Sequence, residues 1–233
     1  MTDHVIVLPG GGYGRLSDNE STTIVAWLET LGLSASVFRY PVGKAARHPA
    51  VLDAVRGEIR ARRDAGADRI ALVGFSAGGH AAGHAALAPG ATDAERVDLA
   101  LLSYPVVSIL LDTHRGSREN LIGLDASAEL RAATSLDLLV TPAAPPFFVW
   151  HTAEDAAVPV QHSYLLGMAL AAAGVRHALH VFPRGRHGLN LARLDGDGDA
   201  VQWTSLAEAW LREEGWLPPV GPDRLGFRAG HAH

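Results

Sequence analysis

Residues 69–79 read RIALVGFSAGG, and this stretch decides the fold. Its first seven residues form a short, mostly apolar run typical of a buried strand, and the small residues that follow favour a helix. Between them, the pentapeptide from Gly74 to Gly78 has the pattern G-x-S-x-G, which requires a sharp strand-to-helix turn. Such a turn leaves no room for side chains two residues before and after the serine. The pattern therefore predicts that Ser76 is exposed at the C-terminal edge of a sheet.

Outward from this stretch, apolar runs alternate with segments of helical periodicity. Strands are expected at 5–8, 34–39, 69–75, 99–104, 145–150 and 177–182, and helices at 18–31, 50–64, 77–88, 160–173 and 200–213. Strands separated by helices indicate parallel pairing. We therefore predict an α/β fold in one domain over 1–217, with a doubly wound, mainly parallel six-stranded sheet and helices on both faces. The segment 106–145, with short helices near 117–122 and 127–133, is a candidate cap or insert, and 218–233 is expected to be irregular.

The composition narrows the class of protein. With 20 Lys and Arg against 25 Asp and Glu, the formal net charge is −5, so no broad positive field attracts nucleic acid or anionic lipid. Cysteine is absent, which excludes disulfides, thiolate metal sites and cysteine nucleophiles. The first residues lack the features of a signal peptide, and no apolar stretch reaches the ~18 residues of a membrane span. We expect a cytoplasmic protein without nucleic-acid or membrane partners, and a homodimer stays open.

Two downstream residues fit the partners that a serine nucleophile needs. A base must take the proton of the hydroxyl and an acid must orient the base, and in this kind of fold the chain order is serine, acid, histidine. Asp155 follows the fifth expected strand and begins a D-x-x-V-P pattern, with Glu154 as its rival for the acid. His187 follows the sixth expected strand. We predict a catalytic group of Ser76, Asp155 and His187.

The segment LPGGGYG follows the first expected strand. Because glycines let backbone N–H groups turn toward a ligand, this segment and the N–H of Ala77 form a candidate oxyanion hole. Which of Gly10, Gly11 and Gly12 supply the donors stays open. A phosphate-binding loop is disfavoured, because Arg15 stands where the pattern G-x-G-x-x-G needs its last glycine.

These motifs resemble the α/β-hydrolase superfamily, and more narrowly a small bacterial branch of acetylxylan and feruloyl esterase-like carbohydrate esterases, also named xylanase B-like. The matching segments, in order from residue 8 to 192, are LPGGGYGRLS, VGFSAGGH, SYPVVS, ENLIG, VTPAAPPFFVWHTAEDAAVPVQHS and FPRGRHGLNLA. The resemblance implies an α/β-hydrolase fold that lacks the N-terminal hairpin. Pro9 stands where many superfamily esterases have histidine, but proline is common in this branch. The implied site residues are the nucleophile Ser76, the acid Asp155, the base His187 and the oxyanion donors Gly11, Gly12 and Ala77.

Further side chains near the expected strand ends are candidates for substrate contact. They are Tyr13, Tyr104 and His151. The alternative for each tyrosine is packing in the core, and the alternative for His151 is support of the loop that carries Asp155. His80 and His84 have the i, i+4 spacing of a zinc site, but neither the H-E-x-x-H pattern nor a third ligand accompanies them. No metal and no organic cofactor is expected.

Together these features predict a serine carboxylic-ester hydrolase that acts on a small-molecule ester through an acyl-enzyme. The resemblance implies a short acyl group, such as acetyl, on a sugar or xylo-oligosaccharide. An arylformamidase or a serine peptidase would use the same three residues. A non-catalytic binding protein on a hydrolase scaffold is a further alternative, disfavoured because all three residues are present.

Overall fold

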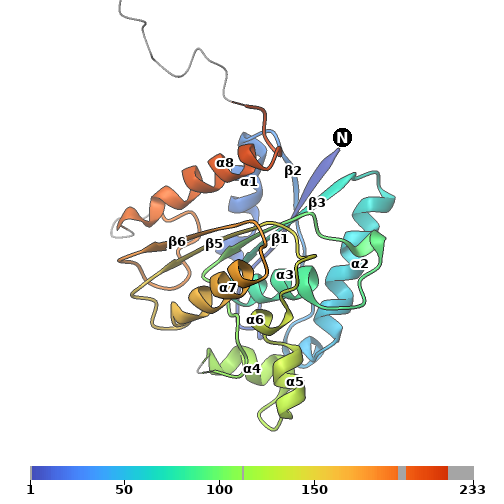
Figure 1. Cartoon of the computed structure of the whole chain (residues 1–233), viewed down its shortest axis with the longest axis vertical. Helices are drawn as coiled ribbons and strands as arrows, with labels where there is room; N and C mark the ends of the chain where they lie inside the picture. Colours follow the sequence, from blue (N-terminus) through green and yellow to red (C-terminus); the bar gives the residue numbers. More distant parts are fainter. Residues whose placement is uncertain (1, 112, 194–197, 220–233) are drawn as a thin grey trace, which may run out of the picture.

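A parallel sheet runs through the centre of the protein (Figure 1). The computed structural model describes residues 2–111, 113–193 and 198–219. The strands are β1 (Asp3–Leu8), β2 (Ser34–Val37), β3 (Arg69–Phe75), β4 (Leu99–Ser103), β5 (Phe147–Thr152) and β6 (His177–Phe182). Their order in the sheet is β2-β1-β3-β4-β5-β6, and each neighbouring pair is parallel. The predicted six-stranded sheet is confirmed, and within the described residues it is parallel throughout.

Helices cover both faces of this sheet, which confirms the doubly wound arrangement. One face packs against α2 (Ala50–Asp64), α3 (Ala77–Leu87) and α7 (Gln161–Ala172), and the other against α1 (Thr22–Thr30) and α8 (Trp203–Glu213). The short 3₁₀ helices are η1 (Asp18–Glu20), η2 (Gly43–Ala46), η3 (Asp93–Glu95) and η4 (Gly198–Gln202). The helices expected at 18–31 and 200–213 therefore each begin with a tighter 3₁₀ turn.

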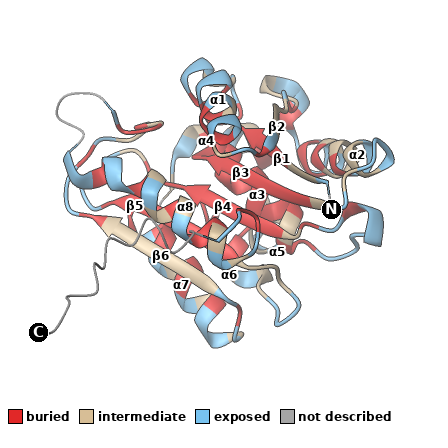
Figure 2. Cartoon of the chain, turned by 90° about the horizontal axis from the view of Figure 1, so that it is seen from above, coloured by how far each residue is buried: buried red, intermediate tan, exposed pale blue. Residues whose placement is uncertain are grey.

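The central strands are buried on both sides (Figure 2). Every residue of β4 and β5 is buried, as is every residue of β3 after the first. This burial explains why their sequences are continuous apolar runs instead of alternating ones. The edge strand β6 is mostly half-buried. On the α8 face, Trp150 of β5 stacks on Trp203 with ring centroids 5.1 Å apart.

The register of the strands brings their C-terminal ends to one edge. Leu8 at the end of β1 pairs with Gly74 near the end of β3, and Thr152 at the end of β5 pairs with Phe182 at the end of β6. The loops that leave these strands therefore meet at the same edge. In open α/β sheets this edge is the usual place for a ligand.

The segment 106–145 contains three short helices. They are α4 (Arg115–Ile122), α5 (Ala128–Ala133) and α6 (Leu136–Leu139). The first two agree with the expected helical pieces, and the third is too short for periodicity to predict. Leu136 anchors the segment, because its side chain is fully buried and its N–H donates to the carbonyl of Val107 over 2.9 Å. The domain bounds of 1–217 and the cap stay predictions, and most of the tail 218–233 lies outside the described residues.

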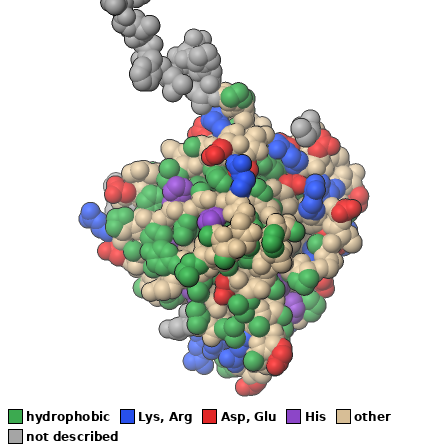
Figure 3. Space-filling view, in the orientation of Figure 1, with side chains coloured by type: hydrophobic (Ala, Val, Ile, Leu, Met, Phe, Trp, Pro, Cys, Tyr) green, Lys and Arg blue, Asp and Glu red, His purple; other side chains and the backbone are tan. Residues whose placement is uncertain are grey.

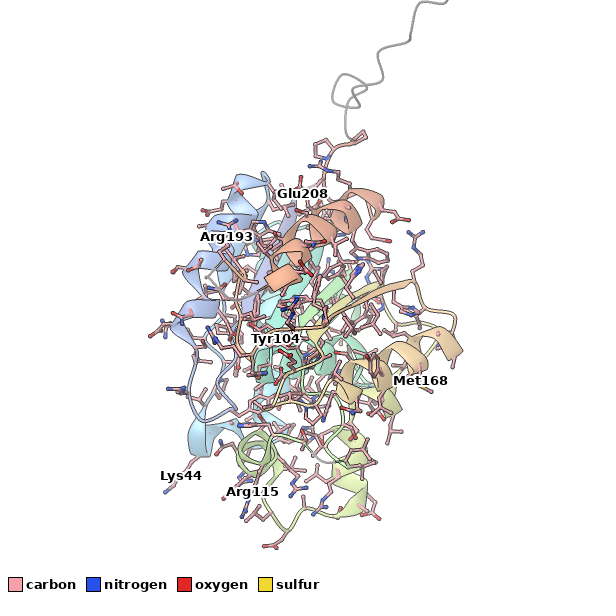
Figure 4. All side chains as sticks on the ribbon, turned by 90° about the vertical axis from the view of Figure 1, so that its left-hand side faces the viewer. Lys44, Tyr104, Arg115, Met168, Arg193 and Glu208 are labelled. Carbon is pink, nitrogen blue, oxygen red and sulfur yellow. The ribbon has the colours of Figure 1, made fainter. Side chains whose placement is uncertain are left out.

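The surface carries charges of both signs. On the face in Figure 3, arginine and acidic side chains lie mainly toward the rim, and hydrophobic side chains gather over the region where Figure 1 places α7. Tyr164 and Met168 of α7 are exposed, and Figure 4 shows Met168 at the surface. Among the described helices, none combines the length and hydrophobicity that crossing a bilayer requires.

Candidate active site

Ser76 occupies a strained turn between β3 and α3. Its φ of 53° is in the left-handed region, which non-glycine residues rarely adopt. Gly78 makes this turn possible, because a Cβ there would overlap the carbonyl oxygen of Leu8 on the neighbouring strand. The Ser76 side chain consequently stands at the N-terminus of α3, at the C-terminal edge of the sheet, with the residue 7% exposed.

The structure brings Ser76, His187 and Asp155 together. Nε2 of His187 lies 2.8 Å from Oγ of Ser76, and Nδ1 lies 2.6 Å from Oδ2 of Asp155. These residues follow β3, β6 and β5 respectively, so three separate loops supply them. With Nδ1–H donating to the carboxylate, Nε2 is free to accept the serine proton.

The Asp155 carboxylate is held as an anion inside the protein. Its Oδ1 accepts the N–H groups of Ala157 and Val158, each over 2.9 Å. Burial on its own would raise the pKa of Asp155, but hydrogen bonds from His151 and His187 hold that pKa well below its usual range. Asp155 therefore stays ionised at neutral pH. Its rival Glu154 is exposed, and within the described residues its side chain accepts a single hydrogen bond, from the N–H of Gly185 over 3.4 Å.

His151 supports Asp155, which is the second of the two roles considered for it, and the expectation that it contacts substrate is wrong. It is fully buried, with Nδ1 2.7 Å from Oγ of Ser163 and Nε2 3.0 Å from the carbonyl of Val158. The same Nε2 lies 3.3 Å from Oδ2 of Asp155. Both ring nitrogens are therefore engaged inside the protein, and the ring backs the carboxylate.

Four consecutive carbonyl groups of the glycine-rich loop after β1, from Pro9 to Gly12, accept hydrogen bonds. The Pro9 carbonyl accepts from the Tyr40 hydroxyl, Gly10 from Ser17 N–H (2.9 Å), Gly11 from Gly14 and Arg15 N–H (3.2 Å each), and Gly12 from Asn120 Nδ2 (2.9 Å). These bonds fix the peptide planes of the loop. They turn its remaining N–H groups in defined directions without help from a ligand.

The hydrogen-bond partners of the loop N–H groups show which glycines could donate to an oxyanion. Gly10 N–H already donates to Oε2 of Glu20 over 2.8 Å. Within the described residues, the N–H groups of Gly11, Gly12 and Ala77 donate to no protein acceptor. Gly11 and Gly12 line the same cavity as Ser76. The N–H groups of Gly11, Gly12 and Ala77 are therefore candidates for binding the oxyanion. Gly10 is not a candidate, because Glu20 already accepts its N–H.

Tyr13 and Tyr104 are buried, which corrects the expectation that they contact substrate. The hydroxyl of Tyr13 lies 2.6 Å from Nδ1 of His80, a histidine inside the core. Tyr104 is 1% exposed and lies in the interior in Figure 4, where its hydroxyl donates to Oε1 of Glu20 over 2.7 Å. Both tyrosines pack in the core, as the alternative interpretation proposed. Neither ring lines the cavity around Ser76.

His80 and His84 are core residues of α3. Nε2 of His80 donates to the carbonyl of Thr134 over 2.7 Å, and Nε2 of His84 lies 3.2 Å from the carbonyl of Ala133. Burial lowers the pKa of His80 to about 4 and that of His84 to about 3. Both are neutral at pH 7, and both tie α3 to the segment 106–145.

The cavity at Ser76 has a volume of about 330 Å³. Its described lining is Gly11, Gly12, Arg15, Ser17, Glu20, Ser76, His114, His187 and Gly188. Sequence reasoning did not name five of these residues as part of the site: Glu20, His114, Arg15, Ser17 and Gly188. The pattern S-x-x-E from Ser17 to Glu20 is typical of a helix cap, although the structure forms no side-chain cap there. His114 lies in the segment without periodicity, which carries no comparable signal.

His114 is an exposed residue that lines the cavity. The N–H of Ser117 donates to its Nδ1 over 3.2 Å. The neutral ring consequently carries its proton on Nε2. Within the described residues this Nε2 has no partner.

Comparison with known proteins shows the family of this chain. Residues 52–214 match the family model described as the prolyl oligopeptidase family. The chain belongs to this α/β-hydrolase family. The match includes all the strand ends that carry Ser76, Asp155 and His187. The expected superfamily, fold and class of hydrolytic enzyme are thereby confirmed.

Solved structures place this member of the prolyl oligopeptidase family near esterases. An acetyl ester-xyloside bifunctional hydrolase from Caldicellulosiruptor lactoaceticus is 36% identical, with a TM-score of 0.87 over 93% of this chain and 85% of that one. The carboxylesterase Cest-2923 from Lactobacillus plantarum is 30% identical, with a TM-score of 0.80 over 94% of this chain and 88% of that one. These neighbours confirm the resemblance to carbohydrate-related esterases.

A curated relative carries the name that the sequence resemblance suggests. Endo-1,4-beta-xylanase B of Butyrivibrio fibrisolvens is 33% identical over 208 residues, which is 82% of this chain. The chain spans about a third of the length of that protein, since the match covers 33% of it.

Proposed function

We propose that the protein is a serine esterase that removes short acyl groups, acetyl above all, from sugars or xylo-oligosaccharides. One observation carries the proposal. The hydrogen-bonded chain from Ser76 Oγ through His187 to Asp155, with spacings of 2.8 and 2.6 Å, opens onto a cavity lined by Gly11 and Gly12, whose N–H groups have no acceptor within the described residues. A nucleophile, a base, an orienting acid and anion-binding donors are the parts that acyl transfer requires.

The proposed reaction follows from these positions. Ser76 Oγ attacks the ester carbonyl while His187 Nε2 takes the hydroxyl proton, and Asp155 stabilises the imidazolium. The N–H groups of Gly11, Gly12 and Ala77 would bind the oxyanion, each donor worth roughly 3–4 kcal/mol. The C–O bond to the alcohol breaks as His187 returns the proton to the leaving oxygen. Water then attacks the acyl-enzyme by the same route and releases the acid and free Ser76.

The lining of the cavity supports a small and polar substrate. No aliphatic or aromatic hydrocarbon side chain is among its described lining residues, so a long acyl chain gains little from burial there. Glu20 is the one carboxylate among them. Cleavage of a glycosidic bond commonly uses a pair of carboxylates, which favours the ester over the glycoside as the bond broken. The names of the esterase neighbours support the same class of substrate.

The test is hydrolysis of p-nitrophenyl acetate, butyrate and octanoate and of acetylated xylose, combined with labelling by a fluorophosphonate and mass mapping of the label. We expect acetate to turn over fastest, with the label on Ser76. Ser76→Ala should abolish both, and Ser127→Ala, an exposed serine at the start of α5, should change neither.

Other outcomes point to the alternatives. Labelled Ser76 without ester turnover would overturn the esterase and direct the search to aryl formamides and peptides, the substrates of the two amide-cleaving alternatives. Absence of both label and turnover would favour a non-catalytic binding protein. Retention of most turnover by Ser76→Ala would remove Ser76 from the nucleophile role.

A further inference from the structure

Glu20 is a buried carboxylate at the edge of the cavity. The residue is 3% exposed, yet it lines the cavity together with Ser76 and His187. No Lys, Arg or His in the described part of the chain forms an ion pair with it. A buried carboxylate without a cation is costly unless hydrogen bonds satisfy it. The hydrogen-bond partners of Glu20 therefore indicate which parts of the site this carboxylate stabilises.

One partner belongs to the glycine-rich loop. Oε2 of Glu20 accepts the N–H of Gly10 over 2.8 Å, and the Gly10 carbonyl accepts the N–H of Ser17 over 2.9 Å. The Cα of Gly10 lies between Glu20 and the nucleophile, since a Cβ there would be 2.6 Å from Oε2 and 3.1 Å from Cβ of Ser76. Glu20 thus holds the loop against Ser76 immediately before the two unpaired N–H groups.

The other partner leads to the loop of the general base. Oε1 of Glu20 accepts the hydroxyl of Tyr104 over 2.7 Å, and the same hydroxyl accepts the N–H of Asn190 over 3.0 Å. Asn190 is in the loop of His187, and the Tyr104 ring packs edge-on against the His187 ring with centroids 5.0 Å apart. Burial, reinforced by the charge of Glu20, raises the pKa of Tyr104 well above its usual value. The hydroxyl therefore remains a donor to Glu20.

We propose that Glu20 is a positioning residue that sets the separation between the oxyanion donors and the general base. The loop after β1 and the loop after β6 start from strands that are not neighbours. Glu20 bonds directly to the loop after β1 and, through Tyr104, to the loop after β6. A single carboxylate therefore fixes the positions of both loops. This inference rests on the proposed esterase function. Errors in such a separation weaken transition-state stabilisation more than substrate binding.

The experiment compares Glu20→Ala, Glu20→Gln, Tyr104→Phe and the double variant Glu20→Ala/Tyr104→Phe with the unmodified protein. Glu95→Gln is the matched control, because Glu95 is also buried and accepts a backbone N–H, that of Thr92 over 2.8 Å, away from the cavity. Steady-state kinetics with p-nitrophenyl acetate give kcat and KM. The final stoichiometry of fluorophosphonate labelling counts the folded sites, and the labelling rate reports on Ser76 itself.

We expect Glu20→Ala to lower kcat per labelled site about 100-fold with KM within about threefold. Glu20→Gln keeps an acceptor for Gly10 and should recover much of this, to about a tenfold loss. Tyr104→Phe should also cost about tenfold, and should have little further effect in the Glu20→Ala background because both break one connection. Glu95→Gln should retain full kcat.

The proposal is overturned if Glu20→Ala keeps kcat within threefold, or if the Glu20 and Tyr104 effects multiply fully. It is also overturned if Glu20→Ala raises KM in proportion to the loss, which would assign Glu20 to substrate binding. Failure of the esterase function itself is recognised separately, because the unmodified protein would then neither turn over the ester nor accept the label. If Glu20→Ala does not fold, Glu20→Gln and Tyr104→Phe give the same decision.

Discussion

Nδ1 of His187 lies 2.6 Å from Oδ2 of Asp155, and the Asp155 side chain has no exposed surface. The histidine ring is accessible at the cavity, whereas its anionic partner is sealed behind it. Because the Asp155 carboxylate is shielded from water, solvent screens its charge less than it would screen an exposed one. In the proposed mechanism this contact orients the ring and stabilises the imidazolium.

Substitution of Asp155 and of Glu154 should show which of the two carboxylates is the catalytic acid. We expect Asp155→Asn to lower kcat by about 10⁴-fold, because an amide neither selects the reactive tautomer of His187 nor balances its charge. The matched change Glu154→Gln at the exposed neighbour should stay within about twofold. Hydrolysis of p-nitrophenyl acetate measures both. The reverse order of effects would assign the acid to Glu154.

The Asn120 side chain should matter for catalysis through the oxyanion loop. Its Nδ2 donates to the carbonyl of Gly12, so Asn120→Asp removes the donor at constant size. We expect kcat to fall about tenfold with KM within about twofold, because the affected N–H groups act mainly in the transition state. Glu119→Gln, an exposed change on the same helix, is the control. A change in KM alone would contradict an oxyanion role for this loop.

His114 should contribute to binding of a sugar ester. Its Nε2–H has no partner in the described protein, and the exposed residue lines the cavity. Loss of one neutral hydrogen bond costs about 1 kcal/mol, so His114→Phe should raise KM for acetylated xylose about fivefold. KM for p-nitrophenyl acetate, which has no sugar hydroxyl, should change less than about twofold. Equal changes for both substrates would place the contact on the ester group instead. Arg115→Ala serves as the neighbouring control.

The buried histidines of α3 should make the fold sensitive to acid. Burial depresses their folded-state pKa to about 4 for His80 and about 3 for His84, against an ordinary value of 6.5. Between these values and 6.5 the unfolded chain binds more protons, so stability is complete above 6.5 and falls as the pH decreases. Each histidine contributes up to about 1.4 kcal/mol of unfolding free energy per pH unit in that window.

Urea unfolding at pH 7, 6 and 5 measures this slope. We expect a double variant, His80→Gln/His84→Gln, to be less stable at pH 7 but to lose less stability between pH 7 and 5. His177, a half-buried histidine at the start of the edge strand β6 whose Nδ1 donates to the carbonyl of Val175 over 2.8 Å, supplies the control His177→Gln. An unchanged slope in the double variant would show that other groups dominate acid unfolding.

The fold was predictable because its signals are local. Continuous apolar runs marked the buried strands, and the pattern around Ser76 marked a turn that few sequences can make. Chain order then located Asp155 and His187, since the loops after successive parallel strands meet at one edge. The three residues proposed for catalysis therefore followed from position along the chain.

The rest of the site depends on contacts between distant segments. Tyr104 comes directly after a strand, but its φ of 38° and the buried Glu20 place its ring beneath the cavity. A position at the end of a strand does not show whether the side chain points into the core or into the cavity. The orientation of Gly10 N–H likewise depends on a carboxylate ten residues away, which the S-x-x-E pattern presents as a helix cap. Such orientations follow from tertiary packing and have no local sequence signal.

The order of the strands gives the two halves of the site different resistance to local opening. Ser76 and the glycine-rich loop extend from β3 and β1, which are paired on both sides, whereas His187 extends from β6, an edge strand paired on one side. Opening of an edge strand breaks one ladder of hydrogen bonds and exposes little of the core. In mild denaturant the amides of β6 should exchange with solvent before those of β3, and activity should disappear before the helical circular-dichroism signal. Inactivation of this protein would then begin as a reversible loss of its base, with the nucleophile still in place.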